Sequence, residues 1–107
     1  MIHIEIFEGP VDSPARTIQF SAEPSAHMIK IGRVASAQLR FENDDQVSRM
    51  HAIIERNHDG IFIIDLGSVL GTYVNDQKIS RRKLSSGDVI SIGRQRLRVT
   101  IVLESTN

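Results

Sequence analysis

The sequence predicts an all-β fold, either a sandwich of two sheets or a closed barrel. Its 107 residues correspond to one domain with a single modest core. Ile and Val together number 23 against six Leu, and branching at Cβ favours strands over helices. Turn sequences also recur at short intervals, which is typical of a sandwich or barrel of short strands. These turn sequences are Gly9-Pro10, Asn43-Asp44-Asp45, Asn57-His58-Asp59-Gly60, Gly67-Ser68, Asn75-Asp76, Ser86-Gly87-Asp88 and Gly93.

Alternation of apolar residues predicts a strand near each end of the chain. Ile2, Ile4 and Ile6 share one face of an extended segment, because side chains two residues apart point the same way. Near the C-terminus one face contains Leu97, Val99, Ile101 and Leu103, and the opposite face contains Arg96, Arg98 and Thr100. The polar residues 104–107 are expected to fray.

The middle of the chain predicts a long loop followed by a hairpin. Residues 33–45 form an irregular loop with at most one short strand at 38–41, and long loops in compact domains are often functional. The turn at 57–60 separates two apolar segments, which predicts a hairpin in which Gly60 adopts a positive φ. The run 61–64 is apolar on both faces, as in a more buried strand. We expect one domain over residues 1–107, which could be a module of a longer protein.

The charge composition argues against non-specific binding of polyanions such as nucleic acids. Thirteen basic residues balance thirteen acidic ones, whereas a general nucleic-acid binder is basic overall. Residues 78–98 are locally basic, but they carry few aromatic residues for stacking, so they indicate a solvated face. Ten of the basic residues are Arg, whose planar fork suits a carboxylate or a phosphate. The composition therefore favours local anion recognition over nucleic-acid binding.

Metal, cofactor and membrane functions find no support in the sequence. There is no Cys for a disulfide or a thiolate metal site, and His3, His27 and His58 lack ligand spacing. No apolar run reaches the length of a membrane span, and residues 1–6 lack signal-peptide features. We expect a cytoplasmic domain without metal, cofactor or membrane insertion.

Four short motifs stand out in predicted loops or at strand edges. They are Ile31-Gly32-Arg33, Val47-Ser48-Arg49-Met50-His51-Ala52, Asp65-Leu66-Gly67-Ser68-Val69-Leu70-Gly71-Thr72-Tyr73-Val74-Asn75 and Gly87-Asp88-Val89-Ile90-Ser91-Ile92-Gly93. Gly-Arg alone carries little information, but the four motifs in this order and spacing are specific. Together they resemble the forkhead-associated (FHA) domain, over a core region of about residues 28–102.

The resemblance implies a sandwich of about eleven mostly antiparallel strands with binding loops at one end. It implies recognition of phosphothreonine in a protein partner during signalling, without enzymatic activity. The implied phosphate-binding residues are Arg33, Ser48 and Arg49, although Arg49 could instead be a strut between loops. The implied loop-supporting residues are Gly32, His51, Gly71 and Thr72. The implied peptide-contact loop contains Ser68, Val69, Leu70 and Asn75.

The chemistry of these residues fits a phosphate site better than a catalytic one. Gly32 permits a tight turn that presents Arg33, and a guanidinium–phosphate pair is a strong, charge-assisted contact. The Ser48 hydroxyl has a proton to donate to a phosphate oxygen. A Ser48–His51 catalytic dyad is conceivable, but nothing supplies an oxyanion hole, so we do not expect an enzyme.

One position departs from the family pattern. Leu70 stands where the family usually has Asn before Gly-Thr, and Val69 stands where Ser or Thr is common. Losing an amide clamp on the peptide backbone costs about 1–3 kcal/mol, or one to two decades in affinity. Three alternatives follow: weakened or altered phosphopeptide binding, a phosphate-independent scaffold that uses the apolar tip, or a Leu70 side chain that turns inward and fills the core.

Overall fold

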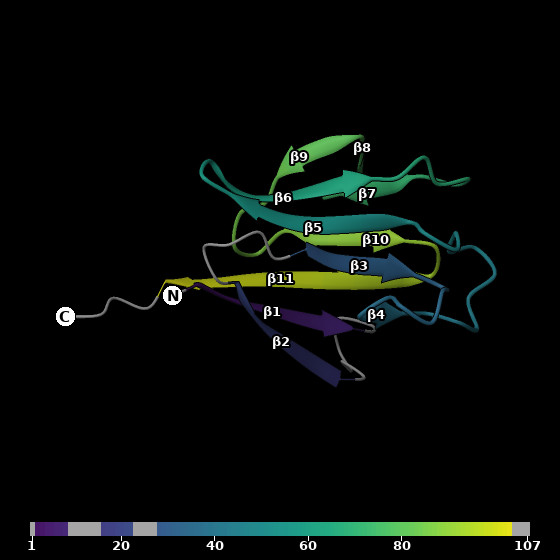
Figure 1. The fold of residues 1–107 in the computed structure, drawn as a ribbon. Helices are drawn as coiled ribbons and strands as arrows, with labels where there is room; N and C mark the ends of the chain where they lie inside the picture. The colour runs from purple at the N-terminus through teal and green to yellow at the C-terminus, as the bar shows by residue number, and fades with distance from the viewer. Residues whose placement is uncertain (1, 9–15, 23–27, 104–107) are drawn as a thin grey trace.

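The computed structural model describes residues 2–8, 16–22 and 28–103, and it describes the side chains of residues 28–101. Two sheets lie face to face, and no helix occurs in these residues (Figure 1). The six-stranded sheet has the order β2 (Arg16–Ala22), β1 (Ile2–Glu8), β11 (Gln95–Leu103), β10 (Val89–Ile92), β7 (Thr72–Val74), β8 (Gln77–Ile79). The five-stranded sheet has the order β4 (Leu39–Arg40), β3 (Met28–Gly32), β5 (Ala52–Asn57), β6 (Gly60–Asp65), β9 (Arg81–Lys83).

Neighbouring strands are antiparallel, apart from the parallel pair β3 and β4. This arrangement confirms the predicted all-β sandwich. The short strand expected at 38–41 is β4, and the expected hairpin joins β5 to β6 with Gly60 at φ 135°. No described segment forms a helix that could cross a membrane.

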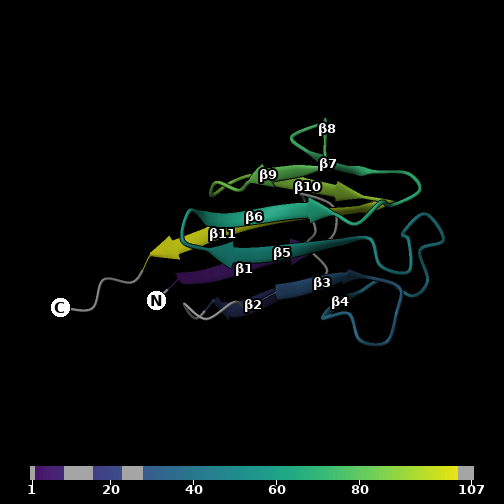
Figure 2. The same ribbon diagram turned by 45° about the horizontal axis from the view of Figure 1, so that its top comes forward.

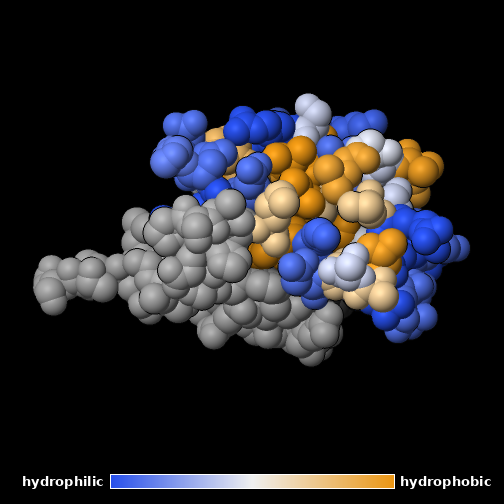
Figure 3. All heavy atoms as spheres, viewed as in Figure 1, coloured by the Kyte–Doolittle hydropathy of each residue, from blue (hydrophilic) through white to orange (hydrophobic). Residues whose placement is uncertain are grey.

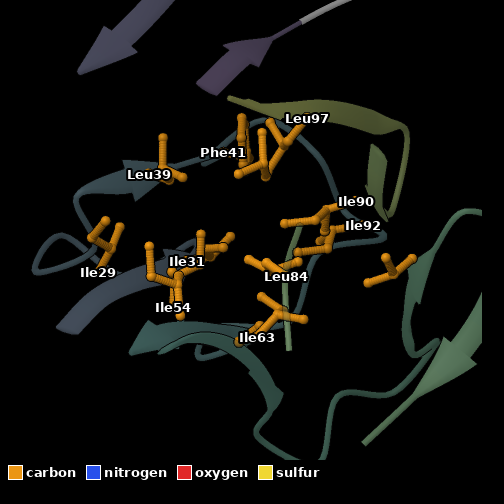
Figure 4. Packing of buried hydrophobic residues seen from close by; sticks show 14 of the residues in the cluster. Ile29, Ile31, Leu39, Phe41, Ile54, Ile63, Leu84, Ile90, Ile92 and Leu97 are labelled. Atoms are coloured by element: carbon orange, nitrogen blue, oxygen red, sulfur yellow. The ribbon is translucent and has the colours of Figure 1, made fainter. Parts of the chain in front are cut away.

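The core lies between the two sheets and contains side chains from both. Figure 4 shows these buried side chains gathered there, with Ile31, Ile54 and Ile63 from one sheet and Ile90, Ile92 and Leu97 from the other. Full burial of one such side chain contributes about 1.5–3 kcal/mol relative to exposure.

Burial along the strands follows the predicted alternation. In β11, Leu97 and Val99 are buried whereas Arg96 and Arg98 are exposed. In β6, Ile61 and Ile63 face the core, and Phe62 on the other face is covered by the Arg81 guanidinium, 4.0 Å from the ring centroid. The side chains of Ile2, Ile4 and Ile6 lie outside the described set, as do residues 104–107.

The outer face of the five-stranded sheet is partly apolar. Figure 3 shows hydrophobic groups gathered over β5 and β6, between hydrophilic groups at the margins. Ile53 and Ile64, which oppose each other on these strands, are half-buried.

Four loops gather at one end of the sandwich. They are residues 33–38, 41–51 and 66–71 and the turn at 93–94, and they lie opposite the end where β1 begins and β11 finishes (Figures 1 and 2). The two packed sheets thus support these loops, and the sequence motifs lie mostly in the loops.

Candidate functional site

The Gly32-Arg33 motif and the motif at 47–52 meet through the backbone. The Arg33 N–H donates to the carbonyls of Ser48 (3.3 Å) and Arg49 (3.0 Å), and the Val34 N–H also donates to Arg49 (3.2 Å). The loop after β3 and the loop before β5 are therefore held as one unit. This unit carries all three residues that the resemblance assigns to phosphate.

Gly32 is required here by a close approach of two backbones. A Cβ on Gly32 would lie 2.2 Å from the Arg49 carbonyl oxygen and 2.9 Å from its carbon. Gly32 is not among the residues with positive φ. The sequence suggested a tight turn, but the structural reason for glycine is that no side chain fits between β3 and residue 49.

The Arg33 side chain is half-buried and anchored at one nitrogen. Its Nε donates to the Val47 carbonyl at 2.7 Å. Arg33 and the exposed Arg49 both line a surface hollow of about 620 Å³, together with Val34, Ala35, Arg40 and Glu42. Among the described residues, no ion pair occupies either guanidinium. The terminal nitrogens of both groups are therefore available for an anion.

The Ser48 hydroxyl is oriented by the neighbouring loop. Its Oγ accepts a hydrogen bond from the Val69 N–H at 3.0 Å. That contact uses a lone pair and not the hydroxyl proton, and the Ser48 hydroxyl donates to no group among the described residues, so its proton can be donated to a ligand. This arrangement presents an O–H donor close to the loop that carries Arg33.

His51 links two loops and does not activate Ser48. It is fully buried; its Nδ1 accepts from the Ser48 backbone N–H (3.0 Å), and its Nε2–H donates to the Gly71 carbonyl (2.9 Å). A catalytic dyad needs the imidazole on the Ser hydroxyl, whereas here the hydroxyl bonds to Val69. The described residues also contain no group of three His, Asp or Glu that could hold a metal.

Asp65, which sequence reasoning did not select, organises the loop at 66–71. Its Oδ2 accepts from the N–H groups of Gly67 and Ser68, both at 3.0 Å. Its Oδ1 accepts from the hydroxyls of Ser68 (2.5 Å) and the buried Thr72 (2.7 Å). Burial by itself would raise the pKa of Asp65, but the four hydrogen bonds outweigh it and hold the pKa below the ordinary value. The available signal was an Asp two residues before Gly-Ser, which is a common Asx-turn pattern.

The same loop presents two apolar side chains to solvent. Val69 is 86% exposed and Leu70 is 52% exposed. The alternative in which Leu70 fills the core is therefore wrong. The Ser68 hydroxyl is already used, since it donates to Asp65 and accepts from the Gly71 N–H.

Asn75 lies in the turn between β7 and β8 and is occupied by the fold. Its amide donates to Asp88 (2.9 Å) and accepts from the Val89 N–H (3.0 Å), and its φ of 50° fits the turn. A contact between Asn75 and a peptide stays a prediction, and the structure does not bring its amide into the loop that contains Val69 and Leu70.

Asp44 joins the loop at 41–51 to the turn between β10 and β11. Its carboxylate accepts from the backbone N–H groups of Arg94 (2.8 Å) and Gln46 (2.9 Å) and from the Gln95 amide (3.0 Å). Burial raises the pKa of Asp44, but these bonds and the nearby Arg94 charge bring the pKa below its ordinary value. The loop that carries Ser48 is thus tied to both sheets.

The sequence matches the FHA domain family over residues 29–93. The oxoglutarate dehydrogenase inhibitor of Corynebacterium jeikeium is 47% identical over 57 residues, which cover 53% of this chain and 40% of that protein. The glycogen accumulation regulator GarA of Mycobacterium tuberculosis is 39% identical over 57 residues, which cover 53% of this chain and 35% of that protein. The matched part is therefore less than half of these relatives.

Solved structures resemble the chain over nearly its whole length. One comes from a structural and functional analysis of phosphothreonine-dependent FHA domain interactions; its TM-score is 0.76 at 30% identity, covering 96% of this chain and 98% of that one. Another is the FhaA FHA domain in complex with the intracellular domain of Rv3910, with a TM-score of 0.69 at 29% identity, covering 92% and 99%. The four motifs, the two-sheet sandwich and these matches agree, and the chain belongs to the FHA domain family.

Proposed function

We propose that this domain recognises phosphothreonine in a protein partner and thereby recruits that partner in signalling. The observation that carries the proposal is the Ser48 hydroxyl, which accepts a hydrogen bond from the Val69 N–H and so keeps its own proton for an anion, on a loop joined to the one that carries Arg33. Among the described residues, neither the Arg33 nor the Arg49 guanidinium forms an ion pair, and both line the same hollow. The relatives support it, because their names describe a regulator and an inhibitor rather than a catalyst. One structural neighbour belongs to a study of phosphothreonine-dependent interactions.

The chemistry of the site matches a phosphate monoester. Arg33 and Arg49 offer charge-assisted donors, which form shorter and stronger hydrogen bonds than neutral groups do. Ser48 adds a neutral donor, so three side chains can share the phosphate oxygens. Because Nε of Arg33 is fixed on Val47, less side-chain entropy is lost when the phosphate binds.

The rest of the proposed peptide site is weaker than in the usual family pattern. Leu70 has no amide with which to clamp the peptide backbone, and Val69 has no hydroxyl. We therefore expect modest affinity, with the phosphate supplying most of the binding free energy. The backbone groups of the loop at 66–71 are held in place by Asp65 and remain part of the peptide-facing surface.

Titration of fluorescent phosphothreonine, phosphoserine and unphosphorylated peptides of identical sequence tests the proposal. We expect only phosphorylated peptides to bind, with phosphothreonine the tighter of the two. Arg33→Gln should abolish binding, whereas Arg98→Gln, an equal charge change on the other sheet, should not. Dissociation constants above about 1 mM for every phosphopeptide, or equal binding of the unphosphorylated form, would contradict phosphate recognition.

A second candidate function is a phosphate-independent scaffold that docks a partner through the loop tip. The high exposure of Val69 and Leu70 favours it, since two adjacent apolar side chains in solvent suit a protein contact. Leu70→Asn discriminates between the candidates. Phosphopeptide recognition predicts tighter binding, by about tenfold from the restored amide. A scaffold predicts unchanged or weaker partner binding in the same variant.

Binding through three side chains requires neither a cofactor nor a catalytic group, so we propose a binding module and not an enzyme. A cytoplasmic location follows as part of the same proposal, because the partner must be phosphorylated by a kinase.

A further inference from the structure

The outer face of the five-stranded sheet differs in polarity from the outer face of the six-stranded sheet. On the six-stranded sheet, outward positions of β10 and β11 include Ser91, Arg96 and Arg98, as expected where an antiparallel sheet meets water. On the five-stranded sheet, the paired outward residues of the two central strands are Ile53 and Ile64, and Figure 3 shows hydrophobic groups gathered there. The apolar centre is therefore a feature that a water-facing sheet does not require.

One cross-strand row on this face has a cation at each end and aliphatic side chains between them. Across β3, β5, β6 and β9, the paired residues are Lys30, Ile53, Ile64 and Arg81. The Arg81 guanidinium stays on this face, because it lies over the ring of Phe62. Adjacent strands are about 4.8 Å apart, so the two cationic residues are separated by about 14 Å. An α-helix with its side chains is about 10–12 Å wide and fits between them when it runs along the strands.

The charges on this face favour an acidic partner. Lys83 on β9 adds a third cation, and Glu55 on β5 adds one carboxylate, which leaves a formal charge of plus two. Within the described part of the chain, no ion pair occupies Lys30, Arg81 or Lys83. A second copy of the chain would bring two faces of the same sign together, and like charges across an interface are unfavourable. The charge pattern thus opposes self-association through this face.

Backbone hydrogen bonding decides which kind of segment suits this face. β5 pairs with β3 and β6, and β6 pairs with β5 and β9, so neither central strand has a free edge. An extended segment laid on the face would leave its own N–H and C=O groups without partners, whereas a helix satisfies most of them internally. Recognition through side chains alone therefore suits a helix with one apolar stripe.

We propose that the outer face of the five-stranded sheet binds an amphipathic helix of a protein partner. The apolar stripe of the helix lies over Ile53 and Ile64. Acidic residues on one flank of the helix meet Lys30, and those on the other flank meet Arg81 and Lys83. The surface uses none of the residues assigned to phosphate, so the inference does not depend on the proposed function, and one partner can occupy both sites.

A random display library of unphosphorylated peptides of about 16 residues, or four helical turns, tests the proposal against the whole chain. The library is first depleted on Ile53→Thr/Ile64→Thr, a double variant that keeps β-branched residues at both positions. We expect the selected peptides to carry apolar residues at helical spacing and a net negative charge. The most enriched peptide is then synthesised, and fluorescence anisotropy gives its dissociation constant for each variant.

Two kinds of substitution should weaken binding of this peptide. Ile64→Thr should weaken it about fivefold by removing apolar contact, and Lys83→Glu about tenfold by reversing one charge. Val89→Thr on β10 and Lys78→Glu on β8 are the matched controls on the other sheet, and both should bind as the wild type does. Circular dichroism checks that each variant is folded. Should Ile64→Thr unfold, the exposed position of Lys83 keeps the test decisive.

Two further measurements separate this inference from the proposed function. Neither Arg33→Gln nor a saturating phosphothreonine peptide should change the affinity of the selected peptide, and competition by the phosphopeptide would overturn the inference. Whether phosphopeptides themselves bind bears on the proposed function alone.

Other results would also contradict a helix-binding face. They are a failure to enrich any peptide, enrichment of neutral or basic sequences, and equal binding by Lys83→Glu and the wild type. Sedimentation that shows self-association lost in Ile53→Thr/Ile64→Thr would identify a second copy as the occupant and overturn the proposal. Binding to phosphatidylserine vesicles that Lys83→Glu abolishes would identify a lipid surface and overturn it as well.

Discussion

His51 is a residue whose role is set by two hydrogen bonds in a fully buried position. One bond reaches the loop that carries Ser48 and the other reaches the loop that carries Gly71. The Ser48 N–H and the Gly71 carbonyl each bond to the imidazole. Leaving a buried polar group without its partner costs about 1–3 kcal/mol of folding free energy.

His51→Ala is therefore expected to lower the free energy of unfolding by about 3 kcal/mol, because it leaves the buried Gly71 carbonyl and the partly buried Ser48 N–H unpaired and opens a cavity. Urea unfolding followed by circular dichroism measures this change. His58→Ala, at an exposed turn, is the control and should stay within about 0.5 kcal/mol of the wild type. Equal losses for both variants would contradict the linking role of His51.

Asp65 makes stability depend on pH in a defined direction. Its pKa is lower in the folded protein than in the unfolded chain, so as the pH falls the unfolded chain takes up the proton first. The contribution of Asp65 to stability is complete above the ordinary Asp pKa of 3.8 and is lost as the pH falls through the lower, folded value.

Asp65→Asn should consequently destabilise the protein most at neutral pH and progressively less below pH 3.8. At pH 7 we expect a loss of about 2 kcal/mol, since an amide offers one acceptor oxygen where the carboxylate offers two. Urea unfolding at pH 7 and at about pH 2.5 gives the comparison. Asp59→Asn serves as the matched control, and a loss for Asp65→Asn that is the same at both pH values would exclude this linkage.

At the scale of elements, the site depends on how closely β3 approaches the loop before β5. The Arg49 carbonyl oxygen lies 2.2 Å from the position that a Cβ of residue 32 would occupy, and the same carbonyl accepts from Arg33 and Val34. The end of the strand and the loop that carries Ser48 are therefore positioned by one contact between two backbones.

Gly32→Ala should separate these two elements, because the added methyl group meets backbone atoms that cannot rotate away. Overpacking of this kind costs about 1–3 kcal/mol, and the displaced Arg49 should also weaken phosphopeptide binding. Chemical denaturation and peptide titration measure the two effects. Ser36→Ala, in the adjacent exposed loop, is the control. Normal stability with normal binding in Gly32→Ala would show that the loop tolerates the shift.

The strands themselves were predictable to a useful degree, whereas the conformations of the loops were not. The strand near the C-terminus follows from apolar side chains at every second residue, and the hairpin at 57–60 follows from its turn residues. Both are local properties of the sequence. The contact between Val69 and Ser48 joins residues 21 positions apart, and no local pattern encodes such a pairing.

At the scale of the whole molecule, the zero net charge limits the electrostatic contribution to association with a partner. Thirteen basic and thirteen acidic residues create no broad attractive field, so the proposed recognition would rest on a few arginines at one end. Electrostatic steering over distances beyond the Debye length, about 8 Å at physiological ionic strength, should therefore be small.

Phosphopeptide affinity should accordingly fall by only about three- to twelvefold when salt rises from about 50 to 200 mM, as expected when one or two charge contacts are made. Titrations at several salt concentrations give the slope. Duplex DNA added under the same conditions should not bind. A steep slope, or DNA binding that salt abolishes, would indicate a polyanion surface along the basic residues of 78–98.

The sequence by itself determined the fold class, the family and the position of the four motifs. The alternation of apolar residues, the turn residues and the spacing of the motifs are all local features of the sequence. Only the tertiary structure decided what the side chains do. It turned Val69 and Leu70 outward, used the amide of Asn75 within a turn, placed the Val69 N–H on the Ser48 hydroxyl, and brought Arg40 beside Arg33. The physical reason is that each of these outcomes depends on which distant backbone group satisfies a hydrogen bond, and that choice exists only once the two sheets have packed.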